Sequence, residues 1–140
     1  MARNDYNDYL RSVPLFADLG KHELEAIGRA ATLLELTAGS VVMREGSIAH
    51  EMVVVMDGEL EVTKDGEHVA DIGPGGIAGE MALLTDAHRH ATVTAKTDVQ
   101  LIHVDGRHFG HLLQEAPQIA VKMLPIVAGR VVENSQHHTH

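Results

Sequence analysis

The fold of this chain is decided by the stretch at residues 79–92, which reads Gly-Glu-Met-Ala-Leu-Leu-Thr-Asp-Ala-His-Arg-His-Ala-Thr. A glycine followed by a short apolar turn predicts a helix start, where free backbone N–H groups attract an anion such as phosphate. Arg89 is the only Lys or Arg between residues 65 and 95, and it adds a planar, permanently charged donor fork. Glu80 would repel a phosphate, but its carboxylate is a natural acceptor for a ligand hydroxyl. The stretch therefore predicts a site for one small ligand that carries a phosphate and a nearby hydroxyl.

The residues on either side extend this pattern. The stretch is preceded by Asp71-Ile72-Gly73-Pro74-Gly75-Gly76-Ile77-Ala78, and it closes with Arg89-His90-Ala91-Thr92. Two earlier segments, residues 38–46 and 56–62, each carry glycines suited to a hairpin. In order and spacing these motifs resemble the cyclic nucleotide-binding domain, of the type found in the cAMP receptor protein and in regulatory subunits of cAMP-dependent protein kinase. The resemblance covers roughly residues 14 to 133.

The resemblance implies which residues would hold a cyclic nucleotide. They are Gly79, Glu80, Met81, Ala82, Arg89, His90 and Ala91. Arg89 would hold the cyclic phosphate together with the backbone N–H groups of Ala82 and His90, while Gly79 and Glu80 would hold the ribose hydroxyl. The ligand is expected to be cAMP, with cGMP as the alternative, and no cofactor is expected.

Two of these residues also have a plainer structural interpretation. Arg89 alternatively pairs with Asp86 or Glu80 at the surface, a contact that is usually worth under about 1 kcal/mol. Glu80 alternatively caps the short helix that starts beside it, a role that is compatible with ribose binding. The apolar side chains of the segment, Met81 among them, are assigned packing only, because they recur at helical spacing.

Three residues depart from the usual pattern of the family. Ala78 stands where an aromatic residue is frequent, which predicts a more loosely anchored cassette, and His88 stands where proline is common. His90 replaces the small residue that follows the arginine near the base, so it bears on the choice between adenine and guanine. The departures at Ala78 and His90 keep a second interpretation open, in which the roll is an interaction scaffold that binds no nucleotide.

The composition predicts one compact domain over residues 1–140. With 140 residues, 44% of them apolar, the chain can bury a single core. The formal net charge of −9 argues against direct binding of nucleic acid, and no DNA-binding helix-turn-helix is expected. The sequence has no run of about 18 apolar residues and no signal sequence, so no membrane contact and a cytoplasmic location are expected. The lack of cysteine excludes a cysteine-ligated iron–sulfur cluster and a thiol redox switch.

The apolar periodicity predicts a mainly β fold with flanking helices. Residues 4–11 and 21–31 carry apolar residues at helical spacing. Residues 32–104 read as short strands separated by glycine-containing turns, which predicts an antiparallel β-roll, or jelly roll, interrupted by the phosphate-binding cassette helix.

Local signals predict where elements begin and turn. Asp18 is the expected N-cap of the second helix, whose apolar face would include Leu24, Ile27 and Ala31. Asp57-Gly58 and Asp65-Gly66 suit two-residue hairpin turns in which φ is positive.

The C-terminal part is expected to contain two helices over about residues 105–133 and a polar tail at 134–140. The first helix is marked by Phe109, Leu112 and Leu113. The second starts at Pro117 and carries a stripe of Ile119, Met123, Ile126 and Val127. Pro125 predicts that this helix bends or breaks near Met123. The stripe closes on the roll, forms a homodimer seam or meets an effector protein.

A metal site is the remaining alternative. His88-Arg89-His90 resembles the His-X-His start of a cupin metal site. Cupins add a glutamate a few positions later, but here Val93-Thr94-Ala95 fills that space, so neither a metal site nor an enzymatic activity is expected. The implied function is binding alone: a sensor whose C-terminal helices rearrange when the nucleotide binds and which signals to an unidentified protein effector.

Overall fold

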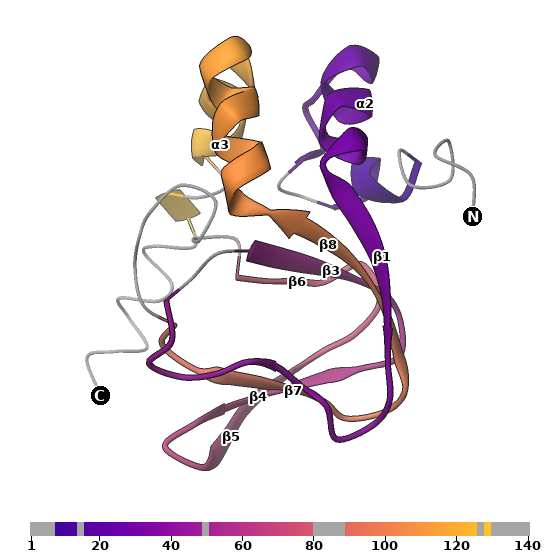
Figure 1. Cartoon of the computed structure of the whole chain (residues 1–140), viewed down its shortest axis with the longest axis vertical. Coiled ribbons are helices and arrows are strands. Elements are labelled where there is room, and N and C mark those ends of the chain that lie inside the picture. The colour runs from indigo at the N-terminus through magenta and orange to yellow at the C-terminus, as the bar shows by residue number, and fades with distance from the viewer. Residues whose placement is uncertain (1–7, 14–15, 49–50, 80–88, 126–127, 130–140) are drawn as a thin grey trace.

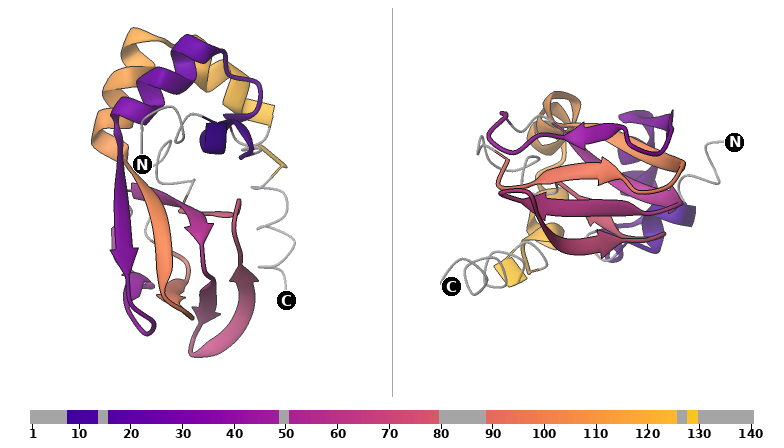
Figure 2. Two further views of the ribbon diagram at one scale, coloured as in Figure 1. Left: turned by 90° about the vertical axis from the view of Figure 1, so that its right-hand side faces the viewer. Right: turned by 90° about the horizontal axis from the view of Figure 1, so that it is seen from below.

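The structure is a computed structural model that describes residues 8–13, 16–48, 51–79, 89–125 and 128–129. Figure 1 shows a roll of two β-sheets, with helices gathered at one end of it. The side view in Figure 2 shows the same helices covering that end, while the strands run away from them. Within the described ranges, no helix is both long enough and apolar enough to cross a membrane.

In the part of the chain that the structure describes, the roll consists of two four-stranded sheets in which every pairing is antiparallel. The first sheet has the order β1 (Ala31–Leu36), β8 (Val99–Asp105), β3 (Glu51–Asp57) and β6 (Ile77–Ala78). The second has the order β2 (Val41–Met43), β7 (Thr92–Ala95), β4 (Leu60–Lys64) and β5 (Glu67–Ile72). This arrangement, with helices flanking it, confirms the predicted mainly β fold. The predicted cassette helix lies outside the described residues.

The central strand β3 separates two hydrophobic cores. Met52 and Val54 face a core shared with the helices, whereas Val53 and Val55 face the inside of the roll. The neighbouring strand β8 alternates in the same way. Successive side chains of a strand point to opposite faces, so a strand with a core on both sides reads as an unbroken apolar run. The run Met52-Val53-Val54-Val55 has this character, and none of the four is more than 1% exposed.

The N-cap of helix α2 (Lys21–Arg29) lies two residues later in the chain than predicted. Its N-cap is Gly20, whose N–H donates to Oε1 of Glu23 at 2.9 Å, so the prediction of Asp18 is wrong. A glutamate three residues into a helix can bond the N-cap N–H from inside, which removes the need for a polar residue before the helix. The helix ends at Arg29, and Ala31 begins strand β1 instead of extending the apolar face.

The two predicted turns have different outcomes. Asp65 and Gly66 have φ values of 53° and 82° and join the paired strands β4 and β5, as predicted for a two-residue hairpin. Gly58 also has a positive φ, 85°, but β3 and β4 lie in different sheets, so the prediction of a hairpin at Asp57-Gly58 is wrong. A side chain at Gly58 would collide with the carbonyl oxygen of Asp98, so glycine is needed here for close approach of the backbone.

The C-terminal helices pack on the helical side of the first sheet. Asp105 caps α3 (Gly106–Glu115), and its Oδ1 accepts the N–H of Arg107 at 2.7 Å. Residues 118–125 form a further helix whose Ile119 and Met123 are fully buried in the helical core. This helix runs unbroken from residue 118 to residue 125, so a break at Met123 is excluded, and the predicted bend stays a prediction. Ile126 and Val127 lie outside the described residues.

Candidate ligand-binding site

The structure describes the two ends of the segment that the sequence singled out. Gly79 follows β6 directly, and Arg89, His90 and Ala91 lead into β7. Residues 80–88 lie outside the described part of the chain. The roles of Glu80, Met81 and Ala82 therefore stay predictions.

The backbone of Arg89 is fixed by the loop that follows β2. Its N–H donates to the carbonyl oxygen of Ser47 at 2.8 Å, and its own carbonyl accepts the N–H of Gly46 at 2.9 Å. Three residues later, the hydroxyl of Thr92 accepts the N–H of Glu45 at 3.0 Å. Loop 44–48 thus holds the chain in register from Arg89 to the start of β7.

The side chain of Arg89 is buried, with 7% of its surface exposed. Its Nη2 donates to the main-chain carbonyl of Glu51 at 2.6 Å and lies 3.5 Å from Oε1 of the same residue. A buried guanidinium is costly unless its charge is compensated, and Glu51 at the start of β3 supplies both a hydrogen bond and an opposite charge. The plainer interpretation of Arg89 as a surface residue is therefore wrong about its exposure. Its suggested partners, Asp86 and Glu80, lie outside the described residues.

Gly79 lies directly against this arginine. Its φ is +79°, and a Cβ added to it would collide with Nη1 of Arg89. The same Cβ would lie 2.7 Å from Cε of Met43 and 2.8 Å from the carbonyl oxygen of Glu51. Glycine is thus required both by the backbone conformation and by the space. The fold brings Gly79 and Arg89 together as the sequence pattern predicts for one binding site.

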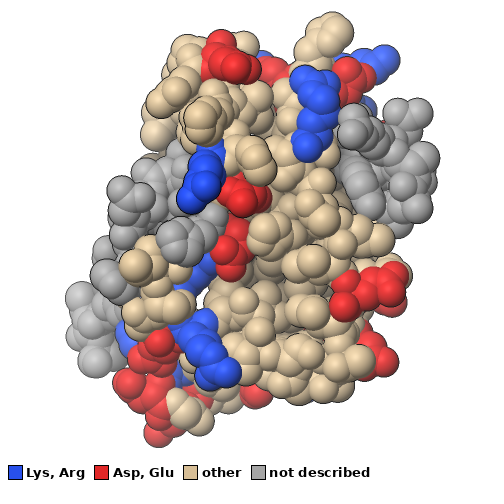
Figure 3. Space-filling view, in the orientation of Figure 1, with Lys and Arg blue, Asp and Glu red and all other residues tan. Residues whose placement is uncertain are grey.

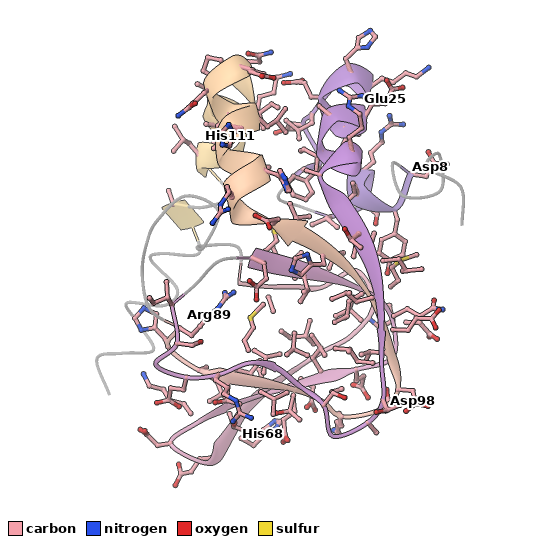
Figure 4. All side chains as sticks on the ribbon, viewed as in Figure 1. Asp8, Glu25, His68, Arg89, Asp98 and His111 are labelled. Carbon is pink, nitrogen blue, oxygen red and sulfur yellow. The ribbon has the colours of Figure 1, made fainter. Side chains whose placement is uncertain are left out.

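His90 and Ala91 extend from this point toward the surface. His90 is exposed and Ala91 is half-buried. Figure 4 shows Arg89 pointing into the molecule from the side of loop 44–48, whereas His68 lies at the end of the roll away from the helices.

Two residues of this arrangement were missed by sequence reasoning. Glu51 reaches Arg89 mainly through its main-chain carbonyl, which any residue type would offer. Met43 is one apolar strand residue among many, and only the fold shows that it lies beside Gly79. Neither residue has a local sequence signal that points to the site.

Acidic residues lie close together on the second sheet, where Glu61 of β4 is paired with Asp71 of β5. Figure 3 shows acidic side chains gathered at the end of the molecule that carries the β4–β5 hairpin, with basic side chains beside them. Lys96 Nζ donates to Asp71 Oδ2 at 3.1 Å, and this hydrogen bond raises the pKa of Lys96. Acidic groups weaken the long-range attraction for an anionic ligand, so affinity has to come from short, desolvated contacts.

Among the described residues, one group of possible metal ligands lies on strands β4 and β5. Glu61, His68 and Asp71 offer atoms within 4.8 Å of one another, and His68 Nδ1 lies 2.8 Å from Glu61 Oε2. The ammonium group of Lys96 already balances Asp71. The sequence motif considered for metal binding, His88-Arg89-His90, contributes no residue to this group, and His88 is outside the described residues.

Comparisons with known proteins give one consistent family. The family whose profile matches, over residues 33–116, is described as the cyclic nucleotide-binding domain. A regulatory subunit of cAMP-dependent protein kinase from Yarrowia lipolytica is 39% identical over 113 residues, which cover 79% of this chain and 30% of the relative. A cyclic nucleotide-gated potassium channel from Rhizobium etli is 36% identical over 109 residues, which cover 78% of this chain and 30% of the channel.

A solved structure agrees with these sequence matches. Cyclic AMP-bound PfPKA-R superposes with a TM-score of 0.80 at 26% sequence identity, and the match covers 96% of this chain and 45% of the other. The chain spans about 30% of the length of the curated relatives that it matches.

Proposed function

This chain belongs to the family of cyclic nucleotide-binding domains, and on that basis we propose that it is a sensor for cAMP. Its biochemical role is that of a cyclic nucleotide-binding regulatory module. The observation that carries the proposal is the contact between Gly79 and the buried, oriented guanidinium of Arg89. Two comparisons support the choice of cAMP. The relative from Yarrowia lipolytica is a regulatory subunit of cAMP-dependent protein kinase, and the similar structure of PfPKA-R is bound to cAMP.

Binding relies on charge and hydrogen bonds at the phosphate end of the ligand. Arg89 donates to the cyclic phosphate, and the N–H groups of Ala82 and His90 complete its environment. Glu80 accepts from the ribose hydroxyl, next to Gly79. A hydrogen bond between a charged donor and a phosphate contributes about 1.5 to 3 kcal/mol net to binding. Because Arg89 is buried, salt screens its hydrogen bond to the phosphate less than it would screen one at the surface.

The proposed function needs no chemical step, so the module is not itself an enzyme. Its roles are to bind the ligand and to report binding. No direct contact with nucleic acid or membrane forms part of the proposal, since the net charge of −9 disfavours both anionic surfaces. A cytoplasmic location and a homodimer are parts of the same proposal.

The output passes through the C-terminal helices to a protein effector. The helix at 118–125 is anchored by the fully buried side chains of Ile119 and Met123 and by a 2.5 Å contact between Lys122 Nζ and Glu23 Oε1. A ligand shifts such a helix only to the extent that it binds one arrangement more tightly than the other. The relatives named above include a kinase regulatory subunit and an ion channel, so a shared sensor domain serves different outputs in them.

Calorimetric titration of the ligand-free protein with cAMP, and separately with cGMP, tests the proposal. Arg89→Ala is expected to weaken cAMP binding at least about tenfold, because the variant loses one charged hydrogen bond to the phosphate. Arg107→Ala is the matched control, because Arg107 is an exposed arginine on α3. Unchanged affinity in Arg89→Ala would contradict the assignment of the phosphate site.

Absence of binding by either nucleotide would favour the alternative function, in which the roll is an interaction scaffold that binds no nucleotide. The departures from the family pattern at Ala78 and His90 are compatible with that alternative.

A further inference from the structure

The phenol of Tyr9 lies where the N-terminal segment meets the first sheet. Its hydroxyl donates to the carbonyl oxygen of Val55 at 2.5 Å and accepts the N–H of Gly75 at 3.0 Å. The same two backbone groups also bond each other, at 2.8 Å. Figure 2 shows the first described helical turn, residues 8–11, between the helices and the strands. One hydroxyl therefore closes a three-way junction between the N-terminal segment, β3 and the turn before β6.

This turn leads directly into the candidate site. Strand β6 is only two residues long and is paired to β3 through Val53 and Val54. At the start of β6 the turn is tied to Val55, whose N–H donates to the carbonyl of Gly76 at 2.9 Å. At its end stands Gly79, against Arg89 and the carbonyl of Glu51. A strand this short has few bonds of its own, so its position depends on how its two ends are held.

We propose that Tyr9 is a positioning residue for the ligand site, which acts by fixing the turn at Gly75 so that β6 presents Gly79 to Arg89. The inference rests on the proposed function, because it concerns the same phosphate end of the site. Tyr9 does not touch the ligand. It acts through the β3–β6 pair, from the end opposite to Glu51.

The surroundings of Tyr9 suit this role. The adjacent Leu10 and the nearby Val13 are fully buried in the helical core, so the backbone that carries the phenol is held firmly. A phenol is both a donor and an acceptor, and both functions are used here. A phenol is protonated at neutral pH, and burial raises the pKa of Tyr9 further above its ordinary value of 10.0. Phenylalanine would keep the ring in place but make neither bond.

The substitution Tyr9→Phe tests the proposal by cAMP titration and by the rate of cAMP dissociation. We expect affinity to fall roughly three- to tenfold and dissociation to become faster, in the range that one ordinary hydrogen bond allows. Ser12→Ala is the matched control, because it also removes a hydroxyl from this segment, but among the described residues that hydroxyl bonds only the local carbonyl of Tyr9, at 2.6 Å. Circular dichroism would establish that both variants are folded at the temperature of the titration.

A purely structural role would lower the stability of Tyr9→Phe without changing its affinity. Binding within twofold of the unsubstituted protein would therefore overturn the proposal, and so would an equal loss in Ser12→Ala. If the unsubstituted protein binds no cyclic nucleotide, the proposed function fails. The role of Tyr9 in positioning β6 is then tested separately, by amide hydrogen exchange of the ligand-free protein. Faster exchange at residues 77–79 in Tyr9→Phe, but not in Ser12→Ala, would support it, and unchanged exchange there would overturn it.

Discussion

Gly79 and Arg89 are in such close contact that a methyl group on residue 79 would overlap the guanidinium of residue 89. The contact joins the end of β6 to the residue that leads into β7, and therefore connects the two sheets at the candidate site. The carbonyl of Glu51 lies beside both residues. A single glycine thus limits where the buried positive charge of the site can lie.

The substitution Gly79→Ala is expected to displace Arg89 and to weaken cAMP binding by about tenfold or more. It also forces an L-residue to a φ of +79°, so unfolding free energy should fall by about 1 to 3 kcal/mol. Gly66→Ala is the matched control, because Gly66 has a φ of +82° but no atom of the described residues lies within 4 Å of the added group. Titration and urea unfolding of both variants would separate displacement from backbone strain. Equal affinities in the two variants would contradict the prediction.

The substitution Lys122→Met is expected to loosen the helix at 118–125 from α2. It keeps the apolar stem of the side chain but removes the ammonium group that lies 2.5 Å from Glu23 Oε1. Because Lys122 is 39% exposed, water compensates part of the loss, and we expect about 1 kcal/mol less stability. Lys21→Met is the control, since Lys21 is an exposed residue of α2. Thermal unfolding measures the difference, and equal stabilities of the two variants would show that the ion pair contributes nothing.

The lowered pKa values of two carboxylates, Glu23 and Asp105, predict that the protein loses stability in acid. The hydrogen bond from Lys122 lowers the pKa of Glu23 below its ordinary value of 4.5. The pKa of Asp105 is also lowered: burial opposes this, but the N–H groups of Arg107 and His108 outweigh it. A carboxyl whose folded-state pKa is depressed contributes stability above its unfolded pKa, and that contribution is lost as the pH falls through the folded value. Urea unfolding should therefore show stability falling as the pH drops below about 4.5.

The variants Glu23→Gln and Asp105→Asn should each flatten this acid dependence. Asn keeps an acceptor at the N-cap, so Asp105→Asn separates titration from capping. An acid dependence as steep as that of the unsubstituted protein in both variants would assign the effect to other groups.

Much of the fold can be predicted from the sequence, because helix faces and tight turns depend on residues that are close together in the chain. The spacing of Leu24, Ile27 and Phe109 marked helix faces that are buried in the structure. The pair Asp65-Gly66 marked a turn whose φ values are fixed by two adjacent residues. The same local rule failed at Asp57-Gly58, because a turn signal does not say which strands will pair.

The candidate site likewise contains residues that the sequence predicts and residues that only the structure shows. Gly79 and Arg89 were predicted because they belong to one continuous motif. Glu51 and Tyr9 were not, since their partners lie 38 and 66 residues away and are reached through backbone groups that carry no side-chain signature. A carbonyl oxygen is the same in every residue, so no pattern of residue types reveals which one faces an arginine.

The double-sided burial of β3 has a consequence for how the molecule comes apart. Met52 and Val54 belong to the helical core, whereas their neighbours Val53 and Val55 belong to the core of the roll. Neither core can be exposed to water without moving the strand that closes the other. We therefore expect the helical cap and the barrel to unfold together in a single transition, and an isolated barrel to expose an apolar wall that the helices now cover.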